Sequence, residues 1–560
     1  MGNWDFLKMI DIILKIYKLI YKRQWLIYLI VFAVAFIIFL YVLAPPTLLC
    51  PDGFYHTKMA LLVKEGNIVK DFPWTQFTTY KNLFVDHHFG YHLLLLPFLS
   101  IPTPKNFDIL STQIDPLLKV KLASAFFAAL AILAIYWFLR KLKVKLPLLW
   151  ILSSFLITNF LFRLSLSRSP ALSLVILILG LYYIVRKKYL GIFLISVFYV
   201  WTYGGWPLMF VCALIYCFSY AIEKLIKKQS IKFALFFKSF FNRSNVKLLL
   251  YCFSGLLIGL IINPYFPKTF PFYWFQTVKI AVLNYQNLIG VGAEWYPSEM
   301  PNFLLDTLPL LIPYIISIAW FISFIKKQKT KQWFFALLSI FFLAYTLKAR
   351  RIIEYLAPII IIFNALIFTQ IIKSINWDNV RKQIKRLFSS TENTFYFITT
   401  IILSSACAFF LIFYLIHGVY GLKQSYQNSS RPVNYLQGAT QWIRNSVPSQ
   451  EIIFHSNWDI FPELLYFDDS HYYVNGLDQT FMYEYDKKLY NDWDDLFTGN
   501  VDPEQTAKII KEKFKASYII ASKSKNDEKF AKLLKKSTNL EKVYEDEQAI
   551  IYRNNLPKNK

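Results

Sequence analysis

Residues 25–44 read WLIYLIVFAVAFIIFLYVLA, an unbroken apolar run. A helix of about 17 to 25 mostly apolar residues bridges the roughly 30 Å of bilayer hydrocarbon, where backbone groups without hydrogen-bond partners are unstable. The run is long, and no small-residue cleavage site follows it, so we do not expect a cleavable signal peptide. The sequence therefore predicts a first membrane span here.

The composition agrees with a membrane protein. Of 560 residues, 56% are hydrophobic and 19% aromatic, while only 17% are charged, which is too apolar for a soluble chain of this size. The net charge of +26 would suggest a nucleic-acid partner in a soluble protein. Here the Lys and Arg residues form short clusters between apolar runs, which is typical of membrane topology, so no nucleic-acid partner is expected.

Further apolar runs predict about eleven spans in total. Residues 189–203 form the shortest of these runs, and 88–100 is too short to cross, so we expect a helix at the membrane surface there. The further predicted spans are 117–139, 146–163, 170–185, 189–203, 205–222, 246–263, 303–325, 331–347, 352–372 and 395–418.

The orientation follows from the basic loops, since short loops rich in Lys and Arg stay in the cytoplasm. Residues 1–24 are then cytoplasmic, and an odd number of spans puts every strong basic cluster on the same side. These clusters lie at 140–145, 186–188, 224–247, 326–331 and 373–386. We therefore expect a multi-pass protein of the cytoplasmic membrane with its C-terminal part outside.

The predicted domain organisation is a transmembrane domain at 25–420, with external loops 45–116 and 264–302, followed by an extracytoplasmic α/β domain at 421–560. Apolar periodicity predicts the elements of that last domain. They are a helix at 433–445, a strand at 451–456, a helix from Pro503, a strand at 517–522, a helix near 526–537 and a hairpin ending at 549–553. The fold class is thus a polytopic α-helical membrane domain followed by an α/β domain.

Asp52 stands in the motif PDGFYH, just after the first span. An acid at this depth can reach the head group of a lipid substrate, whose phosphate and sugar lie at the same level. Alternatively, Asp52 simply caps the helix predicted after it.

The same loop contains DHHFGYH, with Asp86, His87, His88 and His92. Imidazole and carboxylate groups are usual ligands for Zn²⁺ and similar ions, which suggests a metal site. Adjacent histidines rarely point the same way, so a hydrogen-bonded cluster at the interface is the favoured interpretation.

Glu294 lies in GVGAEWYPSEMP, between small residues and the aromatic pair Trp295 and Tyr296. Such rings can stack on a sugar, or they belong to the aromatic belt at the membrane interface. An aromatic belt at the interface does not readily explain why the acidic residue Glu294 lies among these rings.

Several arginines are predicted at the external ends of spans, although Lys and Arg are usually more frequent on the cytoplasmic side. Arg350 and Arg351 begin a late span, and Arg163 and Arg168 lie in FRLSLSRSP. Arginine can bind phosphate with two parallel hydrogen bonds. Snorkelling toward lipid phosphates is the alternative.

In the C-terminal domain, Trp458 and Asp459 follow a predicted strand, in a loop of the kind where binding residues often lie. A tryptophan anchoring the domain core is the alternative. The cysteines show no CxxC or Cys/His ligand spacing, and we expect them to be core residues. They are Cys50, Cys212, Cys217, Cys252 and Cys407.

The order of these motifs resembles the GT-C class of membrane glycosyltransferases, and in particular the catalytic subunit of oligosaccharyltransferase. That family has an acidic motif in its first external loop, a Glu in a later external loop, an Arg at the start of a late span and a WWDYG motif in an external C-terminal domain. The matching positions are Asp52 within PDGFYH, Glu294 within GVGAEWYP, Arg351 with Tyr355 and Pro358 in R-x-x-x-Y-x-x-P, and Trp458 with Asp459 in NWDIF.

This chain departs from the family at two motifs. The family's second acidic motif supplies metal-binding carboxylates, whereas the matching stretch here, RLSLSRSPALSL, has no Asp or Glu. The resemblance implies Mg²⁺ or Mn²⁺ held by Asp52 and Glu294, and the missing motif leaves a metal-independent site as the alternative. The WWDYG motif is only partly matched, so the acceptor stays open.

The resemblance implies transfer of a sugar or oligosaccharide from a polyprenyl-phosphate or polyprenyl-diphosphate carrier to an extracytoplasmic acceptor. Asp52 would act on the nucleophile, Arg351 on the leaving phosphate, and Glu294 on the acceptor or a metal. The expected substrate-binding residues are His56, Arg163, Arg168, Tyr355, Trp458 and Asp459. The rivals are a transporter or lipid flippase and a non-catalytic scaffold; only the enzyme requires Asp52, Glu294 and Arg351 to converge on one external cleft.

Overall fold

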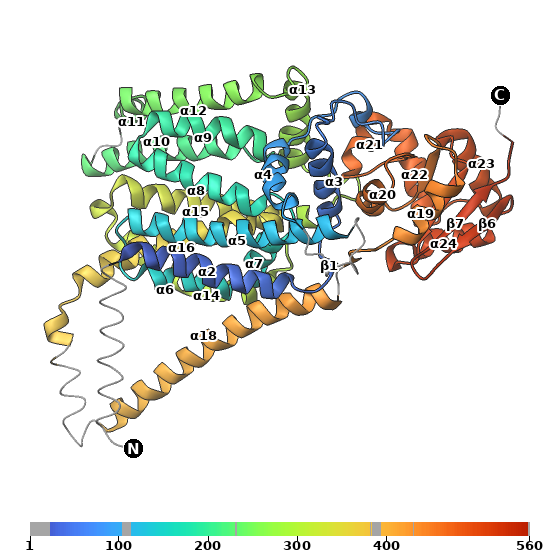
Figure 1. Ribbon diagram of the computed structural model, residues 1–560. Helices are drawn as coiled ribbons and strands as arrows, with labels where there is room; N and C mark the ends of the chain where they lie inside the picture. The colour runs from blue at the N-terminus through green and yellow to red at the C-terminus, as the bar shows by residue number, and fades with distance from the viewer. Residues whose placement is uncertain are drawn as a thin grey trace.

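The computed structural model describes residues 23–102, 114–229, 232–380, 382, 394–428 and 431–557. Most of the predicted cytoplasmic segment 1–24, part of the basic cluster 373–386 and the side chain of Cys407 lie outside the described residues. The chain forms a bundle of long helices with a sheet-containing C-terminal region at one end (Figure 1).

The bundle consists mainly of apolar helices that run side by side, and α18 (Thr394–Asn428) slants away from them (Figure 1). Seven described helices are long and apolar enough to cross a membrane, and the bent pair within 147–165 would make eight. Because α8 and α9 are shorter than a usual span, the count of eleven stays a prediction. The bundle contains α2 (Gln24–Leu43), α5 (Asp115–Lys141), α6 (Pro147–Leu152), η3 (Ser153–Leu156), α7 (Thr158–Ser165), α8 (Pro170–Arg186), α9 (Tyr189–Thr202), α10 (Pro207–Lys227), α11 (Phe233–Phe240), α12 (Arg243–Ile261), α14 (Met300–Ser323), η6 (Ile325–Lys327), α15 (Thr330–Lys348), η7 (Arg350–Ile352), α16 (Ile353–Ser374) and α18 (Thr394–Asn428).

The predicted span 146–163 is not one straight helix. Its two parts, Pro147–Leu156 and Thr158–Ser165, meet at an angle of 85°. Asp306 of α14 stabilises the second part, since its carboxylate accepts hydrogen bonds from the backbone N–H groups of Thr158 (2.8 Å) and Asn159. These are N–H groups at the start of a helix, which have no partner within the helix itself.

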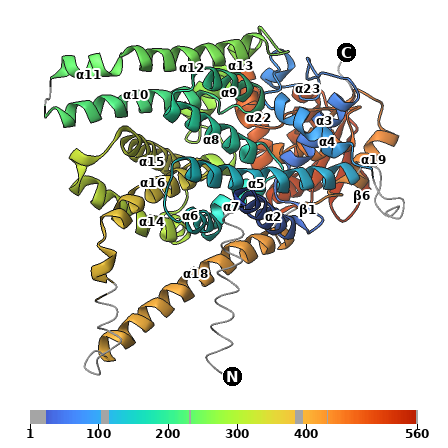
Figure 2. The ribbon, with the colours of Figure 1, turned by 60° about the vertical axis from the view of Figure 1, so that its left-hand side comes forward.

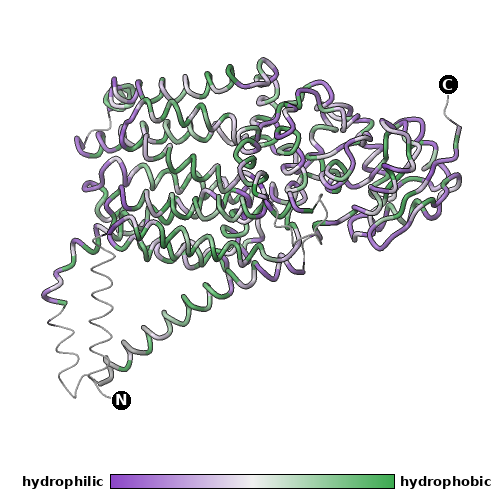
Figure 3. The backbone as a smooth tube through the Cα atoms, in the orientation of Figure 1, coloured by the Kyte–Doolittle hydropathy of each residue, from purple (hydrophilic) through white to green (hydrophobic). Residues whose placement is uncertain are grey.

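The basic loops gather at the end of the bundle away from the C-terminal region. Lys187 donates to the side chain of Asn245 (3.1 Å), and Gln370 donates to Gln328 (3.2 Å), so loops that are distant in sequence meet there. Figure 3 shows hydrophilic residues at the ends of the helices and hydrophobic residues along their middle. This pattern is the one expected of a bundle that spans a bilayer.

The opposite end carries short elements from the two predicted external loops. Helix α4 lies across this end of the bundle (Figure 1) and buries Tyr91 and Leu95. It is too short to cross a bilayer, as the sequence predicts. The elements are β1 (Thr47–Leu48), α3 (Asp52–Lys64), η1 (Thr79–Lys81), α4 (Phe89–Leu99), α13 (Thr269–Tyr273), η4 (Trp274–Leu283) and η5 (Ala293–Trp295).

The C-terminal region contains a five-stranded sheet with the order β4-β3-β5-β7-β6. Strands β4, β3 and β5 are parallel, while β7 pairs antiparallel with both β5 and β6. Helices and strands occur in this part of the chain in the predicted order. They are β2 (Arg431–Pro432), α19 (Gln437–Ser446), β3 (Ile452–His455), η9 (Trp458–Ile460), α20 (Phe461–Phe467), β4 (Tyr472–Tyr473), α21 (Gln479–Tyr485), α22 (Lys487–Thr498), α23 (Pro503–Phe514), β5 (Tyr518–Ser522), η10 (Lys525–Asp527), α24 (Glu528–Lys536), β6 (Leu540–Glu545) and β7 (Ala549–Asn554).

One correction concerns the segment after β3, which the sequence predicts to be a loop. It forms η9, α20 and β4, because Phe461, Leu464 and Leu465 are fully buried and order the backbone around them. Trp458 and Asp459 therefore lie on a short helical turn, which fixes their position more firmly than a loop does.

The C-terminal region is attached to the first long loop, which the sequence predicts to be external. Strand β1 pairs antiparallel with β2. The backbone N–H of Tyr473 donates to the carbonyl of Trp74 (2.7 Å), and the indole N–H of Trp74 donates to the carbonyl of Asp469 (2.9 Å). Lys58 of α3 forms an ion pair with Asp469 (2.7 Å). Figures 1 and 2 both show α3 beside this region.

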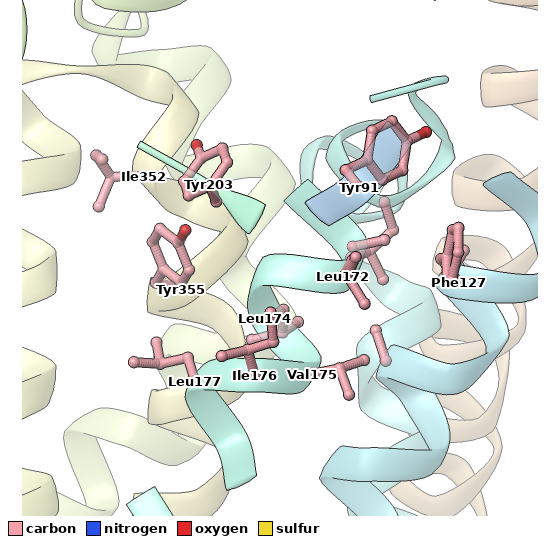
Figure 4. Packing of buried hydrophobic residues seen from close by; sticks show 14 of the residues in the cluster. Tyr91, Phe127, Leu172, Leu174, Val175, Ile176, Leu177, Tyr203, Ile352 and Tyr355 are labelled. Atoms are coloured by element: carbon pink, nitrogen blue, oxygen red, sulfur yellow. The ribbon is translucent and has the colours of Figure 1, made fainter. Parts of the chain in front are cut away.

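Helices α8 and α16 form the centre of the bundle. The stretch Leu174–Leu177 of α8 is buried, and Figure 4 shows it packed between Tyr355 and Ile352 on one side and Phe127 on the other. Residues Ile353–Leu366 at the start of α16 are also buried. A close-packed core of this kind holds the first turn of α16, and with it Arg351, in one position.

Candidate active site

A cavity of about 660 Å³ lies where the end of the bundle opposite the basic loops meets the first long loop and the C-terminal region. Eight of the nine predicted site residues line this cavity. The ninth, Arg163, is not part of the lining but forms an ion pair with Glu294, which is. The eight are Asp52, His56, Arg168, Glu294, Arg351, Tyr355, Trp458 and Asp459. The structure thus brings together residues from five separate parts of the sequence.

Asp52 is the first residue of α3, and the N-cap position before it is occupied by Pro51. The Oδ2 atom of Asp52 lies 3.1 Å from Nε of Arg168. Burial raises the pKa of Asp52, and the charge of Arg168 offsets part of that rise. The carboxylate therefore faces the cavity and Arg168, and the interpretation as a simple helix cap is wrong.

Glu294 is surrounded by guanidinium groups. Its Oε1 lies 2.7 Å from Nη1 of Arg351, and its Oε2 lies 2.5 Å from Nη1 of Arg163 and 3.3 Å from Nη1 of Arg168. Burial alone would raise the pKa of Glu294, but these arginines, led by Arg168, hold that pKa well below its usual range. Glu294 is thus an ionised carboxylate that holds three cations in place.

Arg351 points into the cavity. Its guanidinium carbon lies 4.4 Å from the centre of the Trp295 ring, and its Nη2 donates to the hydroxyl of Tyr203 (2.9 Å). The side chain is largely buried, so it does not snorkel toward a lipid surface. Gly205 makes this geometry possible, because a Cβ atom there would lie 2.6 Å from the Tyr203 ring.

Arg163 has a second acidic partner that sequence reasoning missed. Its Nε donates to Oε2 of Glu354 (2.8 Å), a fully buried residue in the first turn of α16. An acid inside an apolar span is costly unless it is paired, which is the signal that could have identified it. Glu354 also accepts from the hydroxyl of Tyr203 (3.3 Å), so it supports both arginines of this wall.

Tyr355 lines the cavity one helical turn beyond Arg351. Its hydroxyl lies 2.7 Å from Oγ of Ser173, which also lies 2.9 Å from the hydroxyl of Tyr199. Figure 4 shows Tyr355 and Tyr203 next to each other. These buried bonds fix Tyr355 in place.

Two histidines of the first loop, His56 and His92, form a hydrogen-bonded chain with Asp86. Nδ1 of His92 lies 2.7 Å from Oδ2 of Asp86, and Nε2 of His92 lies 2.8 Å from Nδ1 of His56. Burial lowers the pKa of His56 well below its usual value, so its ring is neutral. Of the predicted cluster, Asp86 and His92 are hydrogen-bonded to each other, whereas His87 and His88 line the cavity.

The donor set does not suit a divalent ion shared by Asp52 and Glu294. The guanidinium of Arg168 contacts both carboxylates, and two further arginines hold Glu294. Within the described ranges, no group of three or more His, Cys, Asp or Glu side chains has the geometry of a metal site. A cation placed between these carboxylates would have to displace an arginine.

The C-terminal region supplies the wall opposite the bundle. Trp458 and Asp459 line the cavity, and Nη1 of Arg431 donates to the carbonyl of Asp459 (2.8 Å) and to Oε1 of the buried Glu463 (2.7 Å). Burial raises the pKa of Glu463 to about 7. Trp458 is half-buried: it lines the cavity and also packs against the core that contains the fully buried Trp493, so the alternative that it anchors the domain core stays open.

Another wall of the cavity is apolar and comes from two helices of the bundle and from η4. It also contains Lys348, the residue at the end of α15, whose Nζ donates to the carbonyl of Val282 (2.5 Å). The apolar residues come from α10, η4 and α15. They are Leu208, Val211, Ile280, Ala281, Val282 and Phe341. Apolar residues of spans give no signal in the sequence that distinguishes a binding wall from a lipid-facing surface.

The cysteines fit the predicted pattern with one exception. Cys212, Cys217 and Cys252 are buried and free. Cys50 is only partly buried and lines the cavity beside Asp52, because the chain turns there from the first span into α3.

Solved structures share this fold. The oligosaccharyltransferase AglB from Archaeoglobus fulgidus, in complex with an inhibitory peptide and a dolichol-phosphate, matches 96% of this chain and 75% of its own at a TM-score of 0.58 and 13% identity. ArnT from Cupriavidus metallidurans, bound to undecaprenyl phosphate, matches 95% of this chain and 98% of its own at 0.53 and 12%. The arabinofuranosyltransferase AftD from Mycobacteria matches 96% of this chain but only 40% of its own at 0.54 and 12%.

No protein-family model matches the chain, and no curated protein sequence does. The structural likeness nevertheless extends over nearly all of it, from the first span to the C-terminal region. The chain has the fold of the GT-C membrane glycosyltransferases and resembles the oligosaccharyltransferases among them.

Proposed function

We propose that this protein is a membrane glycosyltransferase that moves a sugar or oligosaccharide from a polyprenyl-linked phosphate carrier to an acceptor outside the cytoplasm. The observation that carries the proposal is the convergence of Asp52, Glu294 and Arg351 on one cavity. A scaffold has no reason to gather them. A transporter would need a charged pathway through the bundle, whereas these residues lie at one end of it.

The two kinds of wall suit an amphipathic donor. The apolar wall formed by α10, η4 and α15 would take the start of the polyprenyl chain, and Lys348 and Arg351 stand where that wall meets the polar part of the cavity. Positive charge placed beside the leaving phosphate stabilises the charge that develops as the sugar–phosphate bond breaks. The comparisons support this choice, since AglB and ArnT were solved with dolichol-phosphate and undecaprenyl phosphate.

The acceptor would enter from the side of the C-terminal region. Trp458 offers an aromatic face and Asp459 a carboxylate that can accept hydrogen bonds. Asp52, across the cavity, would orient the nucleophile and receive its proton, because burial raises the pKa of this carboxyl toward the working range of a general base. The peptide bound to AglB makes a protein one candidate acceptor, and a glycan or lipid hydroxyl would meet the same groups.

The proposal includes a topology. Eleven spans in the cytoplasmic membrane, with the N-terminus inside, would put the basic loops in the cytoplasm and the cavity at the outer surface. A polyprenyl-linked sugar displayed on the outer leaflet could then reach the apolar wall from the bilayer.

The test is mass spectrometry of glycans and lipid-linked intermediates from cells with and without this gene. We expect cells without it to lose one sugar or oligosaccharide from an extracytoplasmic product and to accumulate the matching polyprenyl-linked donor. Restoring the gene should reverse both changes, and restoring an Arg351→Lys variant should not. Unchanged products and intermediates in both strains would contradict the proposal.

A further inference from the structure

The environment of Arg168 sets this site apart from a metal-dependent one. Its three guanidinium nitrogens are all directed at carboxylates: Nε lies 3.1 Å from Asp52, and Nη1 and Nη2 lie 3.3 and 3.4 Å from the two oxygens of Glu294. Asp52 and Glu294 are the two carboxylates that the family resemblance assigns to a divalent ion. One guanidinium therefore already joins them.

The position of Arg168 in the sequence explains how this arises. It lies just before α8, in the stretch where the resemblance places the second acidic motif, and it is the residue of that stretch that enters the cavity. Its side chain is only 17% exposed, and a buried arginine with two acidic partners is costly to displace. An arginine thus stands where a carboxylate ligand would be needed.

The geometry points to Arg168 as the permanent cation of this site, replacing a divalent metal ion, and to a donor whose carrier has one phosphate group and not two. This inference rests on the proposed function. A guanidinium brings one positive charge where a metal ion brings two. It is a weaker partner for a leaving group that carries more charge.

Charge decides between the two donors. A released polyprenyl monophosphate carries up to about two negative charges, and a diphosphate carries about one more. The cations that line the cavity are Arg168, Lys348 and Arg351, and two of these already share the charge of Glu294. Without a metal ion, the positive charge left for the leaving group matches the monophosphate better.

The first arm of the test measures metal binding without turnover. Full-length protein in lipid nanodiscs is titrated with Mn²⁺ and followed by electron paramagnetic resonance. We expect that the parent protein has no Mn²⁺ site that is lost when Asp52 is changed to Asn. Arg168→Asp should bind Mn²⁺ at least about tenfold more tightly than the parent, and Asp52→Asn should abolish that gain. The matched control is Arg186→Asp, at the exposed basic end of the bundle.

The inference would be overturned if the parent protein bound Mn²⁺ at a site that is lost in Asp52→Asn. This comparison of the parent with Asp52→Asn tests the inference even if Arg168→Asp fails to fold. Because it needs no sugar transfer, its outcome is independent of the proposed function. The second arm reads the mass of the polyprenyl-linked donor that accumulates in cells lacking the gene. One phosphate per carrier is the expected result, and two phosphates would overturn the donor assignment.

Discussion

The Nε atom of Arg168 lies 3.1 Å from Oδ2 of Asp52, while the two terminal nitrogens of the same side chain reach Glu294. A lysine keeps the charge but lacks the planar fork of nitrogens, so it cannot reproduce all three of these contacts at once. We expect Arg168→Lys to lower sugar transfer by about ten- to a hundredfold. The measurement is product formed per unit of folded protein in membranes supplied with the lipid-linked donor. Arg186→Lys serves as the control, and an equal loss in both variants would contradict the assignment.

Asp52→Asn keeps the size of the side chain and removes its charge. If Asp52 acts on the nucleophile, transfer should fall by about a hundred- to ten-thousand-fold, the usual contribution of a general base. Expression should be close to that of the parent, since Pro51 and not Asp52 is the N-cap residue of α3. The same exchange at Asp71, an exposed residue of the same loop, should leave transfer unchanged. Near-normal turnover by Asp52→Asn would refute the mechanism proposed for this residue.

Arg351→Lys tests the phosphate-binding role. The planar guanidinium stacks on Trp295 and donates to Glu294 and Tyr203 at the same time, and an ammonium group cannot reproduce this. We expect about a hundredfold loss of transfer, comparable to the removal of one donor from an oxyanion hole. Arg350, its exposed neighbour, offers a matched exchange to lysine that should have little effect. Equal activities of the two variants would indicate that Arg351 has a structural role only.

The stability of the C-terminal region should depend on Glu463. Its pKa is raised to about 7 by burial, from an ordinary value of 4.5, so the folded protein binds a proton more readily than the unfolded chain between these values. This contribution to the free energy of unfolding is fully present below pH 4.5 and is lost as the pH rises through 7, by roughly 3 kcal/mol in total.

Glu463→Gln, which resembles the protonated side chain, should therefore lose less stability than the parent between pH 5 and pH 8. The measurement is the difference in Tm between the two proteins at each pH, which cancels the titration of other groups. A difference that stays constant over this range would show that Glu463 is ionised throughout.

Topology is open to a direct test. A reporter that is active only outside the cytoplasm should be active when fused after residue 430 and silent when fused near residues 228 and 328. The physical reason is the retention of Lys- and Arg-rich loops in the cytoplasm. The opposite pattern would put the cavity on the cytoplasmic side and would contradict the donor geometry as well.

Much of the site could be predicted because its motifs keep their order along the chain. Asp52, Glu294 and Arg351 each follow or precede an apolar run, so their depth relative to the bilayer can be estimated from the sequence. Trp458 and Asp459 follow a strand that alternation and length identify. Their convergence required the resemblance to a known family, since nothing local in the sequence relates them.

The pairings could not be predicted. Arg163 and Glu354 are 191 residues apart, and the contact between them depends on how α7 and α16 pack. Arg168 can be identified in the sequence as a candidate site residue, but its place between two carboxylates depends on the turn that precedes α8. The 85° bend within residues 147–165 was missed for a similar reason: Asp306 of α14 stabilises it from another helix.

The pairing of β1 with β2 has a consequence for biosynthesis. The hydroxyl of Thr47 donates to the carbonyl of Tyr426 (2.7 Å), 379 residues further along the chain. At about 5 to 20 residues per second, a ribosome needs roughly 20 to 80 s to make the intervening chain. During that interval α3 has reached the membrane surface without the wall that carries Trp458 and Asp459. The nascent protein thus remains incomplete at its working end until translation is nearly finished, and a stalled or truncated chain never acquires an enclosed cavity.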